Sequence, residues 1–115
     1  KSEPGYLGSM TFDREHNWAL LTACIRDVLA QVPDANIVAV STTSMREGIA
    51  LYDEKQRELW ACANVDARAV QEVKALRALD PDLEYRLYLQ SGQTFALGAA
   101  PRLLWLKRHQ PELYE

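Results

Sequence analysis

Apolar residues recur at helical spacing behind Asp13, where the first regular pattern of the chain begins. Asp13 is a favourable N-cap residue, and Pro33-Asp34 ends the pattern. The apolar positions on the predicted inner face are Trp18, Leu21, Ile25, Val28, Leu29 and Val32. The spacing therefore predicts a helix that covers a core with this face.

A continuous apolar run, Ile37–Val40, follows this helix and is rich in β-branched residues. Such a run is typical of a strand that is buried on both faces, in a sheet covered by helices. Further along, two apolar stretches at residues 49–52 and 59–63 flank a charged turn at residues 53–57. That arrangement predicts a β-hairpin directly after the first buried strand.

Three more helices are expected in the second half of the chain. Asp66 is expected to cap the first of these helices. Asp80 with Pro81 starts the second helix, and Gly92 ends it. Pro101 opens the third helix. Their predicted inward residues are Val70, Val73, Leu76, Leu79, Leu83, Leu87, Tyr88, Leu103, Leu104, Trp105 and Leu106. The order of elements predicts an α/β or α+β fold with helices covering a sheet.

Composition narrows the functional class. The 115 residues form one domain or part of one, with 48% hydrophobic and 25% charged residues. A net charge of -3 without a basic block argues against nucleic-acid binding, and no apolar run is long enough to span a membrane. Cys24 and Cys62 have no metal-binding spacing, so we expect small core residues in a reducing, cytoplasmic setting.

The segment from Ser44 to Gly48 is the first candidate for chemistry, because it follows the predicted buried strand. Arg46 offers a planar set of donors and Glu47 two acceptor oxygens, which together suit a polyhydroxylated ligand. The alternative is a local ion pair on a surface turn. Neighbouring strand residues point to opposite faces, so shared contact with a ligand needs a kink, which Gly48 would permit.

A second candidate lies where the hairpin gives way to a helix. Asn64 and Asp66 are placed to bind hydroxyls there, and helix capping by Asp66 is the alternative. Residues 91–94 are a third candidate segment, for which a helix stop followed by a polar loop is the favoured alternative. No phosphate-binding glycine motif is visible, and His16 and His109 stand without metal-ligand spacing.

Aromatic and basic residues of the helices are interpreted as structural. Trp18 and Trp105 lie in apolar helical patterns and are expected in the core or an interface, whereas Trp60 could point either way. The basic residues Arg102, Lys107 and Arg108 are too sparse for nucleic acid, and we expect a solvated helix face.

Several ordered segments resemble the N-terminal domain of FGGY-type carbohydrate kinases. They are Gly8–Met10 with Phe12-Asp13, Ile37–Ser41, Ser44–Gly48, Trp60–Arg68, and Gly92–Thr94 followed by Pro101–Leu106. The resemblance covers nearly the whole chain. It implies an actin-like, ribonuclease-H-like domain, here a fragment of the substrate-side domain of a two-domain kinase that binds ATP and Mg²⁺ between its domains.

The resemblance also implies a substrate and residue roles. It is strongest to a branch that phosphorylates the terminal hydroxyl of linear 4,5-dihydroxy-2,3-pentanedione, a small acyclic signal. Arg46 and Glu47 match an Arg-Glu pair that binds substrate hydroxyls in glycerol kinases. Asn64 stands where sugar kinases carry Trp, which suits an acyclic substrate. Asp66 matches an aspartate near the sugar in xylulose kinases, and Arg68 matches the arginine after it, with a structural role as one interpretation.

The family's first phosphate loop is expected before residue 1, and its catalytic aspartate after residue 115. Pro111–Glu115 also has the composition of a helix start, so we expect a fragment that is inactive alone and pairs with a copy of itself. The alternatives are another kinase of the family, for xylulose, ribulose or glycerol, and a non-catalytic kinase-like binding module.

Overall fold

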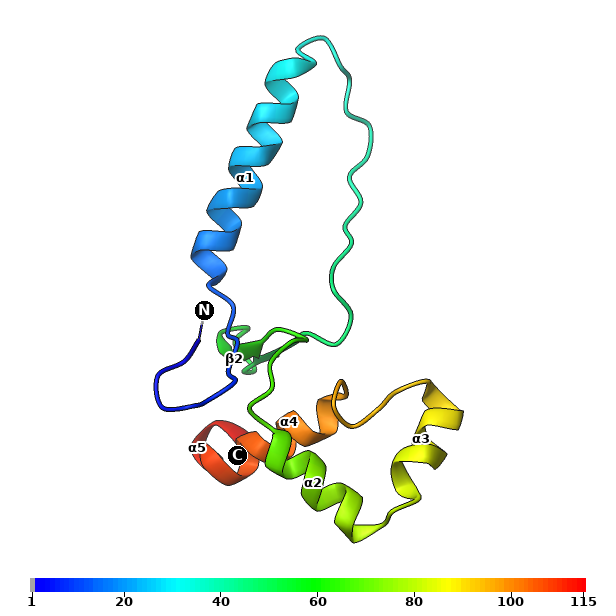
Figure 1. Ribbon diagram of the computed structural model, residues 1–115. Helices are drawn as coiled ribbons and strands as arrows, with labels where there is room; N and C mark the ends of the chain where they lie inside the picture. Colours follow the sequence, from blue (N-terminus) through cyan, green and yellow to red (C-terminus); the bar gives the residue numbers. More distant parts are fainter. Residues whose placement is uncertain (1) are drawn as a thin grey trace.

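A computed structural model describes residues 2–115 as a mixed α/β chain (Figure 1). A long N-terminal helix is followed by a two-stranded sheet and then by shorter helices. The elements are α1 (Arg14–Gln31), β1 (Ile49–Tyr52), β2 (Glu58–Cys62), α2 (Val70–Leu79), α3 (Leu83–Ser91), α4 (Ala99–His109) and α5 (Pro111–Tyr114). This order confirms the predicted mixed class.

The predicted hairpin is present. Strands β1 and β2 pair antiparallel, with Ile49 opposite Cys62 and Leu51 opposite Trp60. Asp53 holds the turn, because its carboxylate accepts hydrogen bonds from the backbone N–H groups of Lys55 and Arg57 and from the Arg57 guanidinium. These local bonds explain why a charged turn closes the hairpin.

The core lies between β2 and the helices that follow it. Trp60 and Cys62 of β2 pack with Ala69, Trp105 and Leu106, and each of the five is at most 6% exposed. We call β1, β2, α2, α4 and α5 the body of the molecule. Buried Cys62, Trp105 and Leu106 confirm their predicted core positions, and the structure places Trp60 inward.

The N-terminal loop is tied to the end of β2. The Ala63 N–H donates to the Met10 carbonyl at 2.8 Å, and the Ala67 N–H donates to the Gly8 carbonyl at 2.8 Å. Gly8 has a φ of +80°, and a Cβ there would lie 3.3 Å from the Ala67 backbone. A glycine is therefore needed at this close approach.

Helix α1 begins and ends as predicted, but its apolar face is not buried. Asp13 caps it by accepting a hydrogen bond from the His16 N–H at 3.1 Å, and Val32 is its C-cap. No residue of α1 is buried, Trp18 is 65% exposed, and Cys24 is also exposed. The predicted core positions of Trp18 and Cys24 are wrong for the described residues, because no element covers this face.

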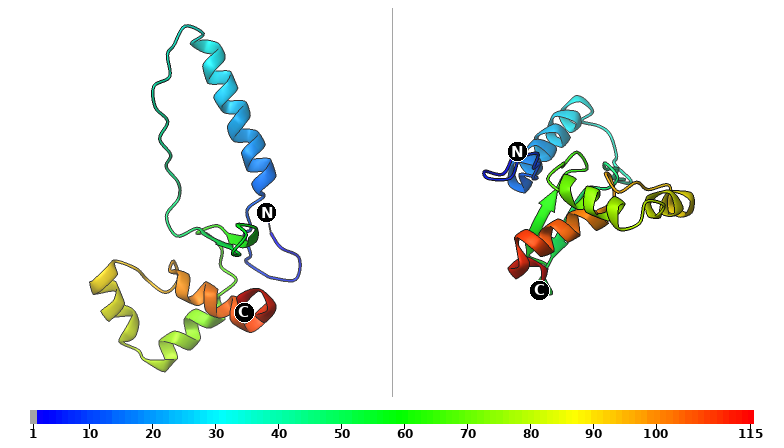
Figure 2. Two further views of the ribbon diagram at one scale, coloured as in Figure 1. Left: turned by 180° about the vertical axis from the view of Figure 1, so that it is seen from behind. Right: turned by 60° about the horizontal axis from the view of Figure 1, so that its bottom comes forward.

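The predicted buried strand at Ile37–Val40 is also absent. This segment is extended but unpaired, and Val38 is 86% exposed. A strand needs a neighbour for its backbone groups, and within residues 2–115 the one sheet is the β1–β2 pair. We call residues 14–43 the arm, which extends away from the body in both views of Figure 2.

The arm gives the chain an elongated shape. The radius of gyration is 18.3 Å, against about 13 Å for a compact domain of similar length. Helices α2 and α3 are present, but α3 begins at Leu83 with Asp82 as N-cap, because Asp80 is the C-cap of α2, and α4 begins at Ala99 rather than at Pro101. Gly92 ends α3 as predicted, in the left-handed region, with φ +69°. Their inner faces are less covered than predicted, since Val70, Leu79, Leu87 and Tyr88 are exposed.

Candidate functional site

Three loops meet above the N-terminal turn of α4. They are residues 44–48 before β1, residues 63–66 after β2, and residues 93–98 before α4, and we call them the rim. The Arg102 side chain donates to one carbonyl in each loop, at Glu47, Asn64 and Leu97. The structure thus brings together parts of the three segments that the sequence singled out, residues 44–48, 64–68 and 91–94.

Arg46 and Glu47 form a turn in which their side chains differ in environment. The Arg46 side chain is 86% exposed and that of Glu47 is 12% exposed, and the Nε–Oε1 distance is 3.9 Å. The predicted kink is present, but it lies at Glu47 itself, with φ +69°. An exposed pair at this distance contributes little to stability, so the ion pair does not by itself explain the turn.

The predicted site residues line two separate pockets. Glu47 and Gly48 line a pocket of about 390 Å³ together with Gln93 and Thr94. Asn64 and Asp66 line another of about 350 Å³, on the side of Arg102 and α2. Pro101 lines both pockets, and Arg46 lines neither. The N-terminal turn of α4 therefore separates the two groups of candidates.

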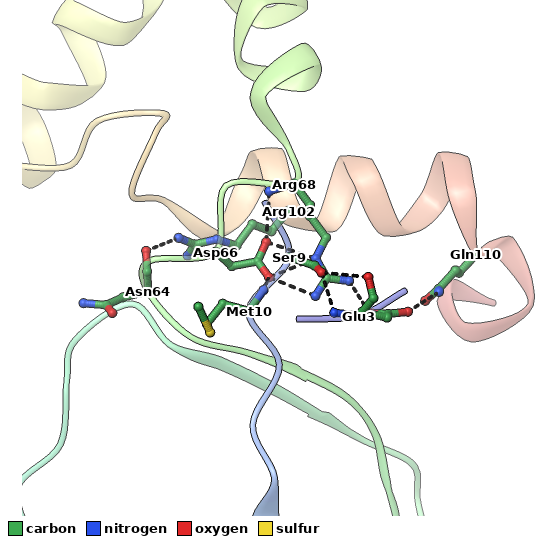
Figure 3. Close-up of polar contacts among 8 residues, drawn as sticks. All are labelled: Glu3, Ser9, Met10, Asn64, Asp66, Arg68, Arg102 and Gln110. Carbon is green, nitrogen blue, oxygen red and sulfur yellow. Dashed lines mark hydrogen bonds and ion pairs between the residues drawn. The ribbon is translucent and has the colours of Figure 1, made fainter. Parts of the chain in front are cut away.

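Asn64 presents its backbone and its side chain in different directions. Its carbonyl accepts a hydrogen bond from Arg102 Nη2 at 2.6 Å. The amide side chain points away from the polar network of the N-terminal loop (Figure 3). An amide carries both donors and acceptors, so this side chain suits a hydroxyl or a carbonyl of a ligand.

Asp66 is buried and its carboxylate is occupied by the protein. It accepts hydrogen bonds from the backbone N–H groups of Met10 and Arg68 and from the Arg68 guanidinium (Figure 3). Burial by itself raises the pKa of Asp66, but the bonds from Arg68 and Met10 outweigh it, so its pKa is lowered. The predicted helix cap is wrong, because Ala69 is the N-cap of α2.

Arg68 is enclosed by partners, which supports the structural interpretation of this residue. Its guanidinium pairs with Asp66 at 2.8 Å and with Glu3 at 2.7 Å. The Arg68 guanidinium carbon also lies 5.2 Å from the Trp60 ring centroid and 4.8 Å from that of Trp105. Cation–π contact and ion pairs together compensate for burial of the charge.

Glu3 was not singled out by the sequence, although it completes this network. Its backbone N–H donates to Ser9 Oγ at 2.7 Å, and its carboxylate pairs with Arg68. Glu3 and Arg68 are 65 positions apart, so no local spacing signals the contact.

Arg102 corrects the prediction of a solvated basic face on α4. Its residue exposure is 1%, whereas Lys107 and Arg108 are exposed. A signal for this was present, because Trp105 and Leu106 follow Arg102 at i+3 and i+4 and share its helix face. Lys107 and Arg108 lie on other faces, so the three basic residues do not form one stripe.

Within residues 2–115, no group of three or more His, Cys, Asp or Glu side chains is placed to hold a metal ion. None of the helices formed by these residues has the length and apolar character of a membrane span.

Comparison with known proteins identifies related sequences. The chain is 54% identical over 114 residues to the autoinducer-2 kinase of Photorhabdus laumondii. The identity is 53% to that of Salmonella typhimurium and 51% to that of Yersinia pestis. Each match covers 96% of this chain and 22% of the relative, so the chain spans about a fifth of their length.

The family model of the N-terminal domain of FGGY carbohydrate kinases matches residues 4–115, nearly the whole chain. The match includes the rim, the arm and the body. The chain therefore belongs to the FGGY family of carbohydrate kinases.

Proposed function

We propose that the intact protein transfers the γ-phosphate of ATP to the terminal hydroxyl of autoinducer-2 in its linear form, 4,5-dihydroxy-2,3-pentanedione. The observation that carries this proposal is the identity of 51% to 54% with proteins named autoinducer-2 kinase. These residues would form part of the N-terminal, actin-like domain of a two-domain kinase, and the reaction would take place in the cytoplasm.

The rim supplies groups that match this substrate. Glu47 provides acceptor oxygens for hydroxyls, Arg46 provides donors for the two carbonyls, and Asn64 provides both kinds of group. We propose that these three side chains orient the substrate. Asp66 is proposed to act indirectly, because its carboxylate already bonds Met10 and Arg68, and it would hold the loop that carries Asn64.

The transfer itself is a displacement at phosphorus. The substrate oxygen bonds to the γ-phosphorus, the bond to the bridging oxygen of ADP breaks, and the hydroxyl proton passes to a general base. Mg²⁺ would neutralise charge on the phosphates when ATP is bound. The role proposed for the residues of this chain is substrate binding.

The proposal is tested by measuring ATP consumption by the intact protein with the pentanedione, xylulose, ribulose and glycerol side by side. We expect preference for the pentanedione. Preference for a sugar or for glycerol would make the protein another kinase of the family. Absence of turnover, with ligand binding retained, would favour a non-catalytic module. The isolated 115-residue chain is expected to consume no ATP.

A further inference from the structure

The guanidinium of Arg102 is the structural link between the loops of the rim. Nη1 donates to the Glu47 carbonyl at 2.8 Å and to the Leu97 carbonyl at 3.2 Å, and Nη2 donates to the Asn64 carbonyl at 2.6 Å. The accepting residues Glu47 and Asn64 lie 55 and 38 positions away in the chain. One side chain therefore sets the spacing between segments that are remote in sequence.

Arg102 is buried without a carboxylate partner. Among the described residues none of its nitrogen atoms lies within ion-pair distance of an Asp or Glu oxygen, and its buried Nε has no hydrogen-bond partner. A buried cation is costly unless it is compensated. Here the compensation comes from backbone carbonyl dipoles, which an ordinary apolar helix residue could not bind.

The bond to Glu47 reaches a strained part of the backbone. Glu47 has a φ of +69°, in the left-handed region, which is unfavourable for a residue with a Cβ. Such a conformation persists where surrounding contacts hold it. The bond from Arg102 to the Glu47 carbonyl is such a contact, and the turn directs the Glu47 side chain to the pocket shared with Gln93 and Thr94.

We propose that Arg102 is a positioning residue for the kinase substrate. It fixes the left-handed turn at Glu47 and the end of β2 at Asn64, and so holds the two pockets that these residues line in place on either side of the N-terminal turn of α4. This inference rests on the proposed function and extends it to a residue outside the predicted site. The flat fork of a guanidinium suits the task, since it reaches several carbonyls at once.

The first test uses the intact protein and compares Arg102→Met with Arg102→Lys. We expect Arg102→Met to raise KM for the pentanedione about tenfold or more, with KM for ATP unchanged, because misplaced binding groups weaken substrate use. Arg102→Lys is expected to recover part of the loss. A fall in kcat alone, with both KM values unchanged, would indicate a merely structural role and overturn the proposal.

Arg108→Met is the matched control. Arg108 lies on the same helix, but its guanidinium pairs with Glu72 at 3.2 Å, whereas that of Arg102 bonds the carbonyls of the rim. We expect its KM values to equal those of the unmodified protein. If Arg108→Met raised KM for the substrate as much as Arg102→Met, the rise would follow from a general disturbance of α4. That result would contradict the proposal.

A second measurement separates failure of this inference from failure of the proposed function. Amide hydrogen exchange of the intact protein without substrate is expected to accelerate at residues 44–48 and 63–66 in Arg102→Met and less in Arg102→Lys. If the unmodified protein phosphorylates none of the four compounds, the proposed function fails, and the exchange result then shows separately whether Arg102 holds the two loops. Unchanged exchange at both loops would overturn the role.

Discussion

The arm and the body carry similar apolar patterns, but the apolar residues are buried in the body and exposed in the arm. Trp105 of α4 is 3% exposed, whereas Trp18 of α1 is 65% exposed. Both lie on apolar helix faces, but the body places β2 against α4, and nothing among residues 2–115 covers α1. Apolar spacing therefore predicts which face can be buried, and burial itself depends on a neighbouring surface.

The largest effect on stability is expected when Trp105 and Trp18 are each replaced by alanine and the two losses are compared. Trp105→Ala removes a ring that contacts Tyr6 and Trp60 and is expected to lower the free energy of unfolding by about 4 kcal/mol. Trp18→Ala is expected to change it by about 0.5 kcal/mol or less. Urea denaturation of the 115-residue chain measures both, and equal losses would show that the arm is packed.

Breaking the buried ion pair between Asp66 and Arg68 should give the next largest effect on stability. Asp66→Asn leaves the Arg68 charge less well compensated, and we expect a loss of about 3 kcal/mol in the free energy of unfolding. Arg77→Met, which breaks the exposed pair with Glu84, is the matched control and should have little effect. Denaturation curves measure both losses of stability. Equal losses for the two variants would contradict the conclusion that the Asp66–Arg68 pair matters more than an exposed pair.

Asp66 also predicts a dependence on pH. Its pKa is lowered in the folded chain, so the folded state binds this proton less readily than the unfolded state. The stabilisation is present above about pH 4, the ordinary range of an aspartate, and is lost as the pH falls through the folded pKa. Asp66→Asn should flatten the acid side of the stability profile, and an unchanged slope would contradict this origin.

The reactivity of the two cysteines compares the arm with the body without any substitution. Burial raises the pKa of Cys62 to about 11, and the nearby Asp66 carboxylate adds to the effect. Cys24 lies exposed on the arm. At pH 8 a thiol reagent should label Cys24 at least about a hundredfold faster than Cys62, because the thiolate is the reactive form. Mass spectrometry of the labelled peptides measures this, and comparable rates would mean that β2 opens readily.

The smallest effect is expected for self-association of the isolated chain. The exposed apolar face of α1 and the unpaired segment Ile37–Val40 favour contact with a second copy. Val38→Ser should weaken any concentration-dependent dimer with little change in unfolding. Analytical ultracentrifugation measures the association, and a strictly monomeric chain at high concentration would contradict the expectation.

Local signals in the sequence were the most reliable guides to the fold. Asp13 at the start of α1, Gly92 at the end of α3 and the charged turn of the hairpin all lie where they were expected. Each depends on contacts within a few residues. Burial of α1 and strand pairing of Ile37–Val40 depend on remote partners, and both predictions are wrong for the described residues.

In the candidate site, too, local features are predicted by the sequence and remote contacts are not. Arg46, Glu47, Asn64 and Asp66 were named from residue type and position, and the structure places Glu47 and Asn64 on loops that Arg102 joins. Asp66 proved to be saturated by Arg68 and Met10. The bonds from Arg102 to these loops are not predicted by the sequence, because its three acceptors are backbone carbonyls, which carry no residue-type signal.

By itself, the sequence determined the hairpin, the cap of α1, the end of α3 and the apolar face of each helix, since these follow from spacing and local hydrogen bonding. Tertiary structure alone decided which apolar faces are covered, which arginine is buried, and whether a carboxylate is free or occupied. The physical reason is that burial and charge compensation depend on groups brought together from distant positions, such as Glu3 with Arg68 and Arg102 with Glu47.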